Sequence, residues 1–185
     1  MRAFVALNFP AELREGLWSA AAPLRALDLP VRWVAARNLH LTLKFLGEVA
    51  EERRDELAAA LDVAVAGVRS LPVQVDGFGA FPDPRRPAVI WAGVASDPAL
   101  ELLQHGVERA FGPLGFPPEG RPFRPHVTLG RTRREARAAA FVPLADALGA
   151  LTWSETVTVS RVNLMRSVTG PGGAGYEEIG HGRLS

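Results

Sequence analysis

Hydrophobic residues alternate with polar or small ones over several short runs of the chain, and this period of two is typical of β-strands with one buried face. Such runs predict strands over residues 2–8, 31–34, 39–45, 73–81, 88–95 and 176–179, with two more inside 153–168. The strands at 73–81 and 88–95 are joined by a segment that contains Pro82, Pro84 and Pro87. Because proline cannot continue a sheet ladder, this segment predicts a turn between antiparallel strands.

Other segments combine Ala, Leu, Glu and Arg at helical spacing. They predict helices over residues 11–24, 51–65, 98–111 and 133–148, the last interrupted near Pro143. Asp97 before Pro98 is typical of a helix start, because the carboxylate accepts hydrogen bonds from backbone N–H groups that the helix leaves unpaired. Segments rich in Gly and Pro predict loops over residues 112–125 and 170–175, the second of them flexible.

This succession of strands and helices, with hairpins among them, predicts an α+β fold with antiparallel sheets rather than a doubly wound parallel sheet. The 185 residues suffice for a single domain, residues 1–185, built as two small lobes that share a core. No Gly-rich loop of the Walker or dinucleotide-binding type occurs in the sequence, so no nucleotide triphosphate cofactor is expected.

The composition, with 48% hydrophobic and 22% charged residues, is that of a globular protein. No apolar run reaches the length of about 18–20 residues that crosses a membrane, so we expect a cytoplasmic protein without membrane contacts. A net charge of only +1 argues against holding long nucleic acid by bulk charge, so any RNA contact should be local. The chain has no cysteine, which leaves His, Arg, Thr, Ser and carboxylates for catalysis.

One four-residue pattern occurs twice, as His-Leu-Thr-Leu at 40–43 and as His-Val-Thr-Leu at 126–129, which is 86 positions later. In a strand, residues two apart share a face and lie about 6.6 Å from each other, so each copy presents an imidazole beside a hydroxyl. The interval is close to half of the chain, which predicts two related halves that each contribute one strand to a shared site.

Two imidazoles on opposite sides of a phosphorus atom can act together as acid and base, because the pKa of histidine lies near neutrality. One of His40 and His126 would activate an incoming oxygen while the other protonates the departing one. Thr42 and Thr128 can donate hydrogen bonds to the non-bridging phosphate oxygens. Arg131 follows the second motif, where it either binds phosphate in bidentate fashion or is one of many surface arginines.

The remaining ionisable candidates lack such a context. His105 lies on a predicted helix and His181 near the end of the chain, and both are expected to be structural or solvent-exposed. No third His, Asp or Glu stands at ligand spacing beside either repeated histidine, so no metal site is expected. Lys44, the single lysine, lies two positions beyond Thr42; it reflects either biased codon usage or a cation at the rim of the cleft.

At these motifs the chain resembles the 2H phosphoesterase superfamily, and within it the bacterial and archaeal RNA 2′,3′-cyclic phosphodiesterases, historically called 2′-5′ RNA ligases. The likeness covers nearly the whole chain. Besides the two tetrapeptides, the segments that carry it are Arg2–Pro10, Asn38–Gly47, Gly79–Pro82, Trp91–Val94, Phe123–Arg131 and Leu164–Ser167.

The resemblance implies a bilobal fold, with two pseudo-symmetric lobes of antiparallel sheet and outer helices around a central groove. It implies that His40 is the proton donor to a leaving 3′ oxygen and that His126 is the proton acceptor that activates water, with a 2′-phosphomonoester as product. Thr42, Thr128 and Arg131 would hold the phosphate. The expected substrates are RNA ends or small nucleoside 2′,3′-cyclic phosphates, turned over by a monomer that needs no metal or other cofactor.

Other functions remain open at this point. If a 5′-hydroxyl replaces water, the same groups run a reversible 2′-5′ RNA ligation, expected as a side activity. A non-catalytic module that binds RNA ends or cyclic phosphates, and an enzyme for a different ester such as a 1″,2″-cyclic phosphate, would use the same groove.

Further RNA contacts are expected from arginines and phenylalanines, which a solvated charged face and a hydrophobic core explain equally well. The candidate arginines are Arg85, Arg86, Arg121, Arg124, Arg133, Arg134 and Arg137, and the candidates for base stacking are Phe9, Phe45, Phe78 and Phe123.

Overall fold

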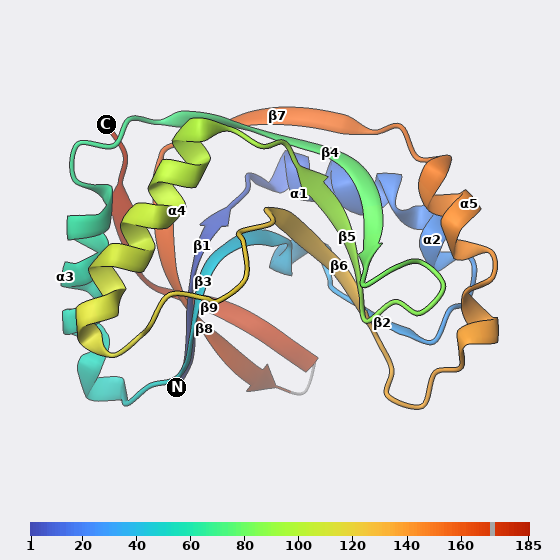
Figure 1. Ribbon diagram of the computed structural model, residues 1–185, viewed down its shortest axis with the longest axis horizontal. Helices are drawn as coiled ribbons and strands as arrows, with labels where there is room; N and C mark the ends of the chain where they lie inside the picture. The colour runs from blue at the N-terminus through green and yellow to red at the C-terminus, as the bar shows by residue number, and fades with distance from the viewer. Residues whose placement is uncertain (171–172) are drawn as a thin grey trace.

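A computed structural model describes residues 1–170 and 173–185, whose strands all belong to one antiparallel sheet (Figure 1). The strands are β1 (Arg2–Asn8), β2 (Val31–Trp33), β3 (His40–Glu48), β4 (Leu71–Phe81), β5 (Val89–Val94), β6 (His126–Thr132), β7 (Ser154–Val159), β8 (Arg161–Gly170) and β9 (Gly173–Arg183). They follow the order β7-β4-β5-β6-β3-β1-β8-β9, and β2 pairs with β6 in addition.

The sheet has the same build on both sides of its centre. The central strands β3 and β6 pair with each other, and each continues outward through strands of its own half, β1-β8-β9 on one side and β5-β4-β7 on the other. The two halves also have their own helices, as Figure 1 shows. The predicted α+β class with two related lobes of antiparallel sheet is therefore confirmed, and the two His-x-Thr motifs lie on the two central strands.

The helices of the described residues divide between the two halves (Figure 1). They are α1 (Ala11–Ala20), α2 (Ala22–Arg25), α3 (Arg54–Val65), α4 (Pro98–Phe111) and α5 (Leu144–Gly149). Helices α3 and α4 pack against each other beside β3, β8 and β9, whereas α2 and α5 pack together beside β4. As predicted, the carboxylate of Asp97 starts α4 by accepting hydrogen bonds from the N–H groups of Ala99 (2.8 Å) and Leu100 (3.3 Å).

Helices cover one face of the sheet, and the main hydrophobic core lies between these helices and that face. Alternate residues of the strands, such as Val5 and Leu7 of β1, are fully buried in this core. The intervening residues Phe4 and Ala6 point to the opposite face, where they form a small separate cluster with Met165. We call this second face the groove face.

Two predicted helices differ from the structure. The helix expected over residues 133–148 is wrong: only a 3-10 turn at Ala138–Phe141 and the short α5 form, because Pro143 interrupts the segment and residues 133–137 offer no apolar stripe to bury. The helix expected over residues 11–24 breaks into α1 and α2 before Pro23, which occupies the first turn of α2.

The C-terminal hairpin is longer than the sequence predicts. The loop expected over residues 170–175 is wrong at both ends, since β8 runs to Gly170 and β9 begins at Gly173; residues 171–172 lie outside the described residues. The strand predicted at 176–179 extends to Arg183 because it pairs with β8 over its length. Among the described residues, no helix has the length and apolar character that crossing a membrane requires.

Candidate active site

The two His-x-Thr motifs meet at the centre of the sheet. Leu41 of β3 pairs with Val127 of β6 in antiparallel register, and both side chains are buried in the main core, 1% and 0% exposed. Their neighbours therefore point to the groove face, with His40 beside Thr128 and Thr42 beside His126. The two imidazoles occupy opposite corners of this square, and diagonal positions of that kind lie about 7–8 Å apart. A phosphate group flanked by two hydrogen bonds fits such a gap.

Each imidazole is held by the same backbone contact. Nδ1 of His40 lies 2.7 Å from the carbonyl oxygen of Asn38, and Nδ1 of His126 lies 2.7 Å from the carbonyl oxygen of Arg124, in both cases two residues earlier in the chain. A carbonyl oxygen can only accept a hydrogen bond, so Nδ1 carries the proton in both rings. The neutral imidazoles consequently present an unprotonated Nε2 to the groove.

The hydroxyls of the two motifs lie on the groove face with the histidines. Oγ1 of Thr42 lies 3.1 Å from Nε2 of His40, where it donates to the neutral ring. Thr128 pairs across the sheet with Trp91 and lies on the groove face with the imidazoles. The two hydroxyls and the two Nε2 atoms thus border the same part of the groove, as donors and acceptors for one small anion.

Aromatic rings pack against both imidazoles. Phe4 lies 4.9 Å and Tyr176 lies 5.0 Å from the ring of His40, measured between ring centroids. On the other half, Phe81 meets His126 edge to face at 5.1 Å. These contacts fix the ring planes and partly remove the imidazoles from water.

The surroundings lower the pKa of both histidines. Burial is the main cause in each case, since it disfavours the charged imidazolium; the hydrogen bond to the backbone carbonyl opposes it, and the positive charge of Arg131 adds to it. The pKa of His40 and that of His126 therefore lie below the usual 6.5. Because its positive charge lowers the pKa of both rings, the exposed guanidinium of Arg131 lies within electrostatic reach of each.

A β-bulge brings Arg131 to the groove face. The pairing of β5 with β6 shifts by one residue between Thr128 and Gly130, so Leu129 is the extra residue. Without this bulge Arg131 would point to the core. An equivalent shift in the pairing of β1 with β3 makes Leu43 the extra residue there and brings Phe45 to the groove face. The two bulges occupy corresponding positions in the two motifs.

Comparison with known proteins identifies the family of this chain. A family model described as the 2′-5′ RNA ligase superfamily matches residues 13–171. The chain belongs to this superfamily. It is 32% identical over 181 residues, 97% of this chain and 96% of the relative, to the RNA 2′,3′-cyclic phosphodiesterase of Methanothermobacter thermautotrophicus.

Solved structures of other proteins share the fold of this chain. The crystal structure of Escherichia coli LigT complexed with 3′-AMP matches with a TM-score of 0.77 and 30% identity, covering 100% of this chain and 98% of that one. The crystal structure of TT0787 of Thermus thermophilus matches with a TM-score of 0.79 and 26% identity, with the same coverage of 100% and 98%. The family resemblance inferred from the sequence motifs is thereby confirmed.

Lys44 does not lie at the rim of the groove, contrary to one of its two interpretations. The bulge at Leu43 turns its side chain toward the core, where it is 1% exposed. There Nζ donates to a carboxylate oxygen of Glu108 on α4 and, at 2.9 Å, to the carbonyl oxygen of Pro117. In this member of the 2′-5′ RNA ligase superfamily, the lysine therefore ties β3 to α4 and to the segment that leads to His126.

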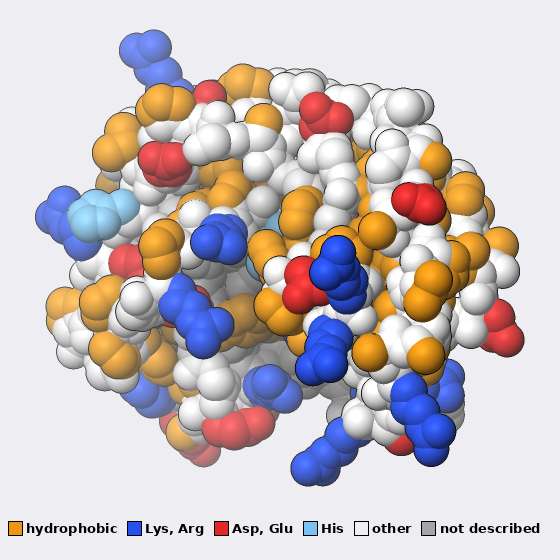
Figure 2. Space-filling view, turned by 45° about the vertical axis from the view of Figure 1, so that its right-hand side comes forward, with side chains coloured by type: hydrophobic (Ala, Val, Ile, Leu, Met, Phe, Trp, Pro, Cys, Tyr) orange, Lys and Arg blue, Asp and Glu red, His pale blue; other side chains and the backbone are white. Residues whose placement is uncertain are grey.

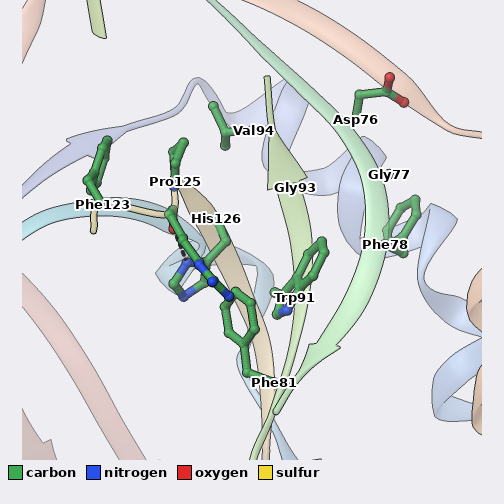
Figure 3. A pocket seen from close by; sticks show the side chains of 11 residues that line it. Asp76, Gly77, Phe78, Phe81, Trp91, Gly93, Val94, Phe123, Pro125 and His126 are labelled. Carbon is green, nitrogen blue, oxygen red and sulfur yellow. Dashed lines mark hydrogen bonds between the residues drawn. The ribbon is translucent and has the colours of Figure 1, made fainter. Parts of the chain in front are cut away.

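The four candidate phenylalanines fall into different environments. Phe9 is 4% exposed and belongs to the core, which excludes it from base stacking, whereas Phe45 is 55% exposed on the groove face. Phe78 and Phe123 line a hollow beside His126 (Figure 3). The ring of Phe78 nevertheless points to the core side, because it pairs with the fully buried Ala92.

The candidate arginines at 85, 86, 121, 124, 133, 134 and 137 are all exposed. Figure 2 shows Lys and Arg side chains on several sides of a hollow in the surface of the protein. Such a border attracts an anionic ligand toward the hollow without giving the whole molecule a large net charge.

As predicted, one of the two remaining histidines is solvent-exposed and the other makes a structural contact. His105 is exposed on α4. Nδ1 of His181 donates to Glu178 at 2.8 Å, and Glu178 in turn accepts a 2.7 Å hydrogen bond from the buried Asn163. Within residues 1–170 and 173–185, no three His, Asp or Glu side chains gather closely enough to ligate a metal ion.

Several residues of the site have no signal in the sequence around the motifs. Tyr176 reaches His40 only because β9 pairs with β8 and β8 with β1. Phe81 and Trp91, whose rings lie 5.1 Å apart, reach His126 from β4 and β5 in the same way. The alternation within a strand shows which of its residues share a face. Which strand lies beside it depends on the order of the strands in the complete sheet.

Proposed function

We propose that this protein hydrolyses RNA ends that carry a 2′,3′-cyclic phosphate and yields 2′-phosphomonoesters, without a metal ion. The observation that carries the proposal is the paired arrangement of His40 and His126, two imidazoles clamped through Nδ1 on one face of the central strands. The names of its relatives support the reaction class, since the Methanothermobacter protein is an RNA 2′,3′-cyclic phosphodiesterase.

In the proposed reaction, Nε2 of His126 accepts a proton from a water molecule while the water oxygen attacks phosphorus. The bond between phosphorus and the 3′ oxygen breaks on the opposite side, and Nε2 of His40 donates its proton to that oxygen. The entering and leaving oxygens must stand on opposite sides of phosphorus, which matches the placement of the two histidines at opposite corners of the motif square. In this step Nε2 of His126 acts only as the proton acceptor and Nε2 of His40 only as the proton donor.

The phosphate oxygens gain negative charge as water attacks. Thr42 and Thr128 donate hydrogen bonds from the two motifs, and Arg131 supplies a positive charge within reach of both imidazoles. Burial and the positive charge of Arg131 lower the pKa of both imidazoles, whereas a bound phosphate anion raises the pKa of His40 and favours its protonation. Substrate binding and formation of the catalytic acid are therefore coupled.

The ribose and base of the cyclic end belong on the side of His40, because the proposed leaving oxygen is part of that ribose. Phe45 offers an exposed ring there, next to Phe4 at a centroid distance of 6.4 Å. A base stacked on Phe45 would be held without sequence preference, since every base has an aromatic face.

The test is product analysis with 2′,3′-cyclic AMP in the presence of EDTA. We expect conversion to 2′-AMP, with rates reduced by about 10² to 10⁴ for His40→Ala and for His126→Ala. His105→Ala is the matched control, because this exposed histidine lies on α4 away from the groove face.

Other outcomes separate the competing functions. Formation of 3′-AMP, or activity abolished by EDTA, would contradict the proposed reaction. Binding of the cyclic nucleotide without any turnover would assign the groove to a non-catalytic module that recognises RNA ends. Faster turnover of a 1″,2″-cyclic phosphate than of the 2′,3′-cyclic ester would assign the enzyme to a different substrate.

A further inference from the structure

Arg32 lies directly opposite Arg131 in the sheet. The short strand β2 pairs with the end of β6 in antiparallel register, and Arg32 is the partner of Arg131 (Figure 1). The neighbouring Val31 and Trp33 pack against the main core, so the side chain of Arg32 points to the groove face, as that of Arg131 does. The Cβ atoms of residues paired in this way lie about 4.5–5.5 Å apart. Two arginine side chains therefore stand side by side at this end of the groove.

Neither of these arginines has a partner of opposite charge. Within residues 1–170 and 173–185, no carboxylate forms an ion pair with Arg32 or Arg131. On the other flank of β6, the partner of Arg131 is the apolar Val89. Both arginines are exposed. Like charges that stand opposite each other on paired strands are unfavourable, and a bound anion removes this repulsion.

Arg32 lies on the same flank of β6 as His40. Strand β5 occupies one flank of β6, whereas β3 and β2 follow each other along the other flank. His40 stands beside Thr128, three positions before Arg131, which corresponds to about 10 Å along the strand. The charge of Arg131 lowers the pKa of His40 and of His126, whereas the charge of Arg32 is not among the causes of either shift. The guanidinium of Arg32 is therefore one step farther from the reacting phosphate than that of Arg131.

The groups along this flank follow the order of the groups in a nucleotide. In the proposed reaction the ribose lies beside His40 and the base stacks on Phe45, which lies farther along β3 in the direction away from β2. A ribose carries its base on C1′ and its 5′ oxygen on the branch at C4′, on opposite sides of the 2′,3′-cyclic ester. With the base at Phe45, the 5′ oxygen is directed toward β2 and Arg32.

Further positive charge surrounds this end of the groove. The connection between β4 and β5 carries the exposed Arg85 and Arg86. It is tied to the end of β6, because the carbonyl oxygen of Ala88 accepts a 3.0 Å hydrogen bond from the N–H group of Thr132. The carboxylate of Asp83 in this connection is itself engaged, since it accepts a 2.7 Å hydrogen bond from the N–H group of Arg85. Such a collection of arginines attracts a ligand with more than one negative charge.

We propose that Arg32, together with Arg131, binds a second phosphate group, the one attached to the 5′ oxygen of the nucleotide that carries the cyclic ester. The inference rests on the proposed function and adds a specificity-determining residue to it. A guanidinium group binds a phosphate through two parallel hydrogen bonds. Arg131 stands between the two phosphates, and Arg32 contacts only the second. A nucleoside 2′,3′-cyclic phosphate with a free 5′-hydroxyl leaves this subsite empty, so the preferred substrate is phosphorylated on its 5′ oxygen.

The experiment compares three substrates: 2′,3′-cyclic AMP, the same nucleotide with a 5′-phosphate, and the dinucleotide ApA with a 2′,3′-cyclic phosphate end. For the wild-type protein, we expect kcat/KM to be at least about tenfold higher for the two substrates that carry the second phosphate. Arg32→Gln should remove most of this preference, and Arg32→Lys should keep part of it, because lysine retains the charge without the paired donors.

The matched control is Arg109→Gln, which removes one exposed arginine from α4 and should keep the wild-type preference. A ratio between substrates does not depend on how much of each variant folds, so a general loss of protein cannot imitate the expected result. The two phosphorylated substrates also separate the sources of the group. A gain for the 5′-phosphate alone that Arg32→Gln removes supports the proposal with a free monoester as ligand, and such a gain for the dinucleotide alone supports it with the phosphodiester of an RNA chain.

Other results overturn the second phosphate site. If the wild-type protein turns over cyclic AMP as fast as the two other substrates, or if Arg32→Gln keeps the full preference, Arg32 binds no second phosphate and the proposed function stands. A loss of the preference in Arg109→Gln as large as in Arg32→Gln would reduce the effect to net charge and overturn the site as well. If the wild-type protein turns over none of the three substrates, the proposed function itself fails.

Discussion

Leu41 lies opposite Val127 in the antiparallel pairing of the two central strands. This single contact between buried side chains sets the register of everything on the other face of the sheet. A shift by one residue would turn both histidines into the core, because the side chains of a strand alternate between faces. The site therefore depends on hydrophobic packing beneath it as much as on the polar groups themselves.

Arg131 influences both histidines, so its removal should move both pKa values. A nearby positive charge disfavours the imidazolium, and Arg131→Gln should therefore raise the pKa of His40 and of His126. We expect both limbs of the profile of kcat/KM against pH to move to higher pH. The maximum of kcat/KM should fall by about 10- to 100-fold, because a charged hydrogen-bond donor to phosphate is lost.

NMR titration of the two imidazoles checks the shift independently of activity. The matched control is Arg133→Gln, which removes an exposed arginine from the segment after β6. If the histidines of the Arg131→Gln variant titrate as they do in the wild type, the guanidinium lies too far from the rings to hold a phosphate between them.

The ion pair of Lys44 and Glu108 is buried, with side chains 1% and 10% exposed. Removing one member alone should therefore destabilise the protein more than removing both. Lys44→Met would leave the carboxylate of Glu108 without its partner and lower the free energy of unfolding by about 3–5 kcal/mol. The double variant Lys44→Met, Glu108→Leu should recover much of this loss. Urea denaturation measures both, and equal losses for the single and the double variant would contradict the role of the pair.

Gly130 is packed too tightly for any side chain. A Cβ atom would stand 2.5 Å from Cγ1 of Val31 and 2.9 Å from Cε3 of Trp33, both on β2. Gly130→Ala should therefore cost about 1–3 kcal/mol of stability and displace the neighbouring Arg131, which lowers turnover as well. Gly149→Ala is the control, since a Cβ atom there meets nothing within 4 Å. Thermal unfolding distinguishes them, and equal melting temperatures would contradict the close packing.

The sequence was informative where chemistry and periodicity coincide. The repeated His-x-Thr pattern places an imidazole and a hydroxyl on one face of a strand, and the alternation in β1 and β5 predicts where those strands run. The start of helix α4 was predictable because Asp97 and Pro98 mark it. These features depend on residues close together in the chain, so local rules suffice.

Features that depend on the whole sheet were not predictable in this way. The bulges at Leu43 and Leu129 reverse the alternation, which moves Lys44 into the core and Arg131 to the groove face, and no local residue type announces them. The contact of Tyr176 with His40 likewise requires three strand pairings to be known. For the segment 133–148, Pro143 and the exposure of its neighbours outweighed helix propensity.

The central claim is that His40 and His126 act as acid and base on the same phosphorus atom, and the pH dependence of the single variants tests it most directly. In His40→Ala only the base remains, so the residual kcat/KM for 2′,3′-cyclic AMP should rise with pH to a plateau. In His126→Ala only the acid remains, and the residual rate should fall as pH rises. The wild-type protein should show both limbs. The paired roles of the two histidines would be contradicted if both variants kept the bell-shaped pH profile of the wild-type protein, or if they lost less than about threefold in rate.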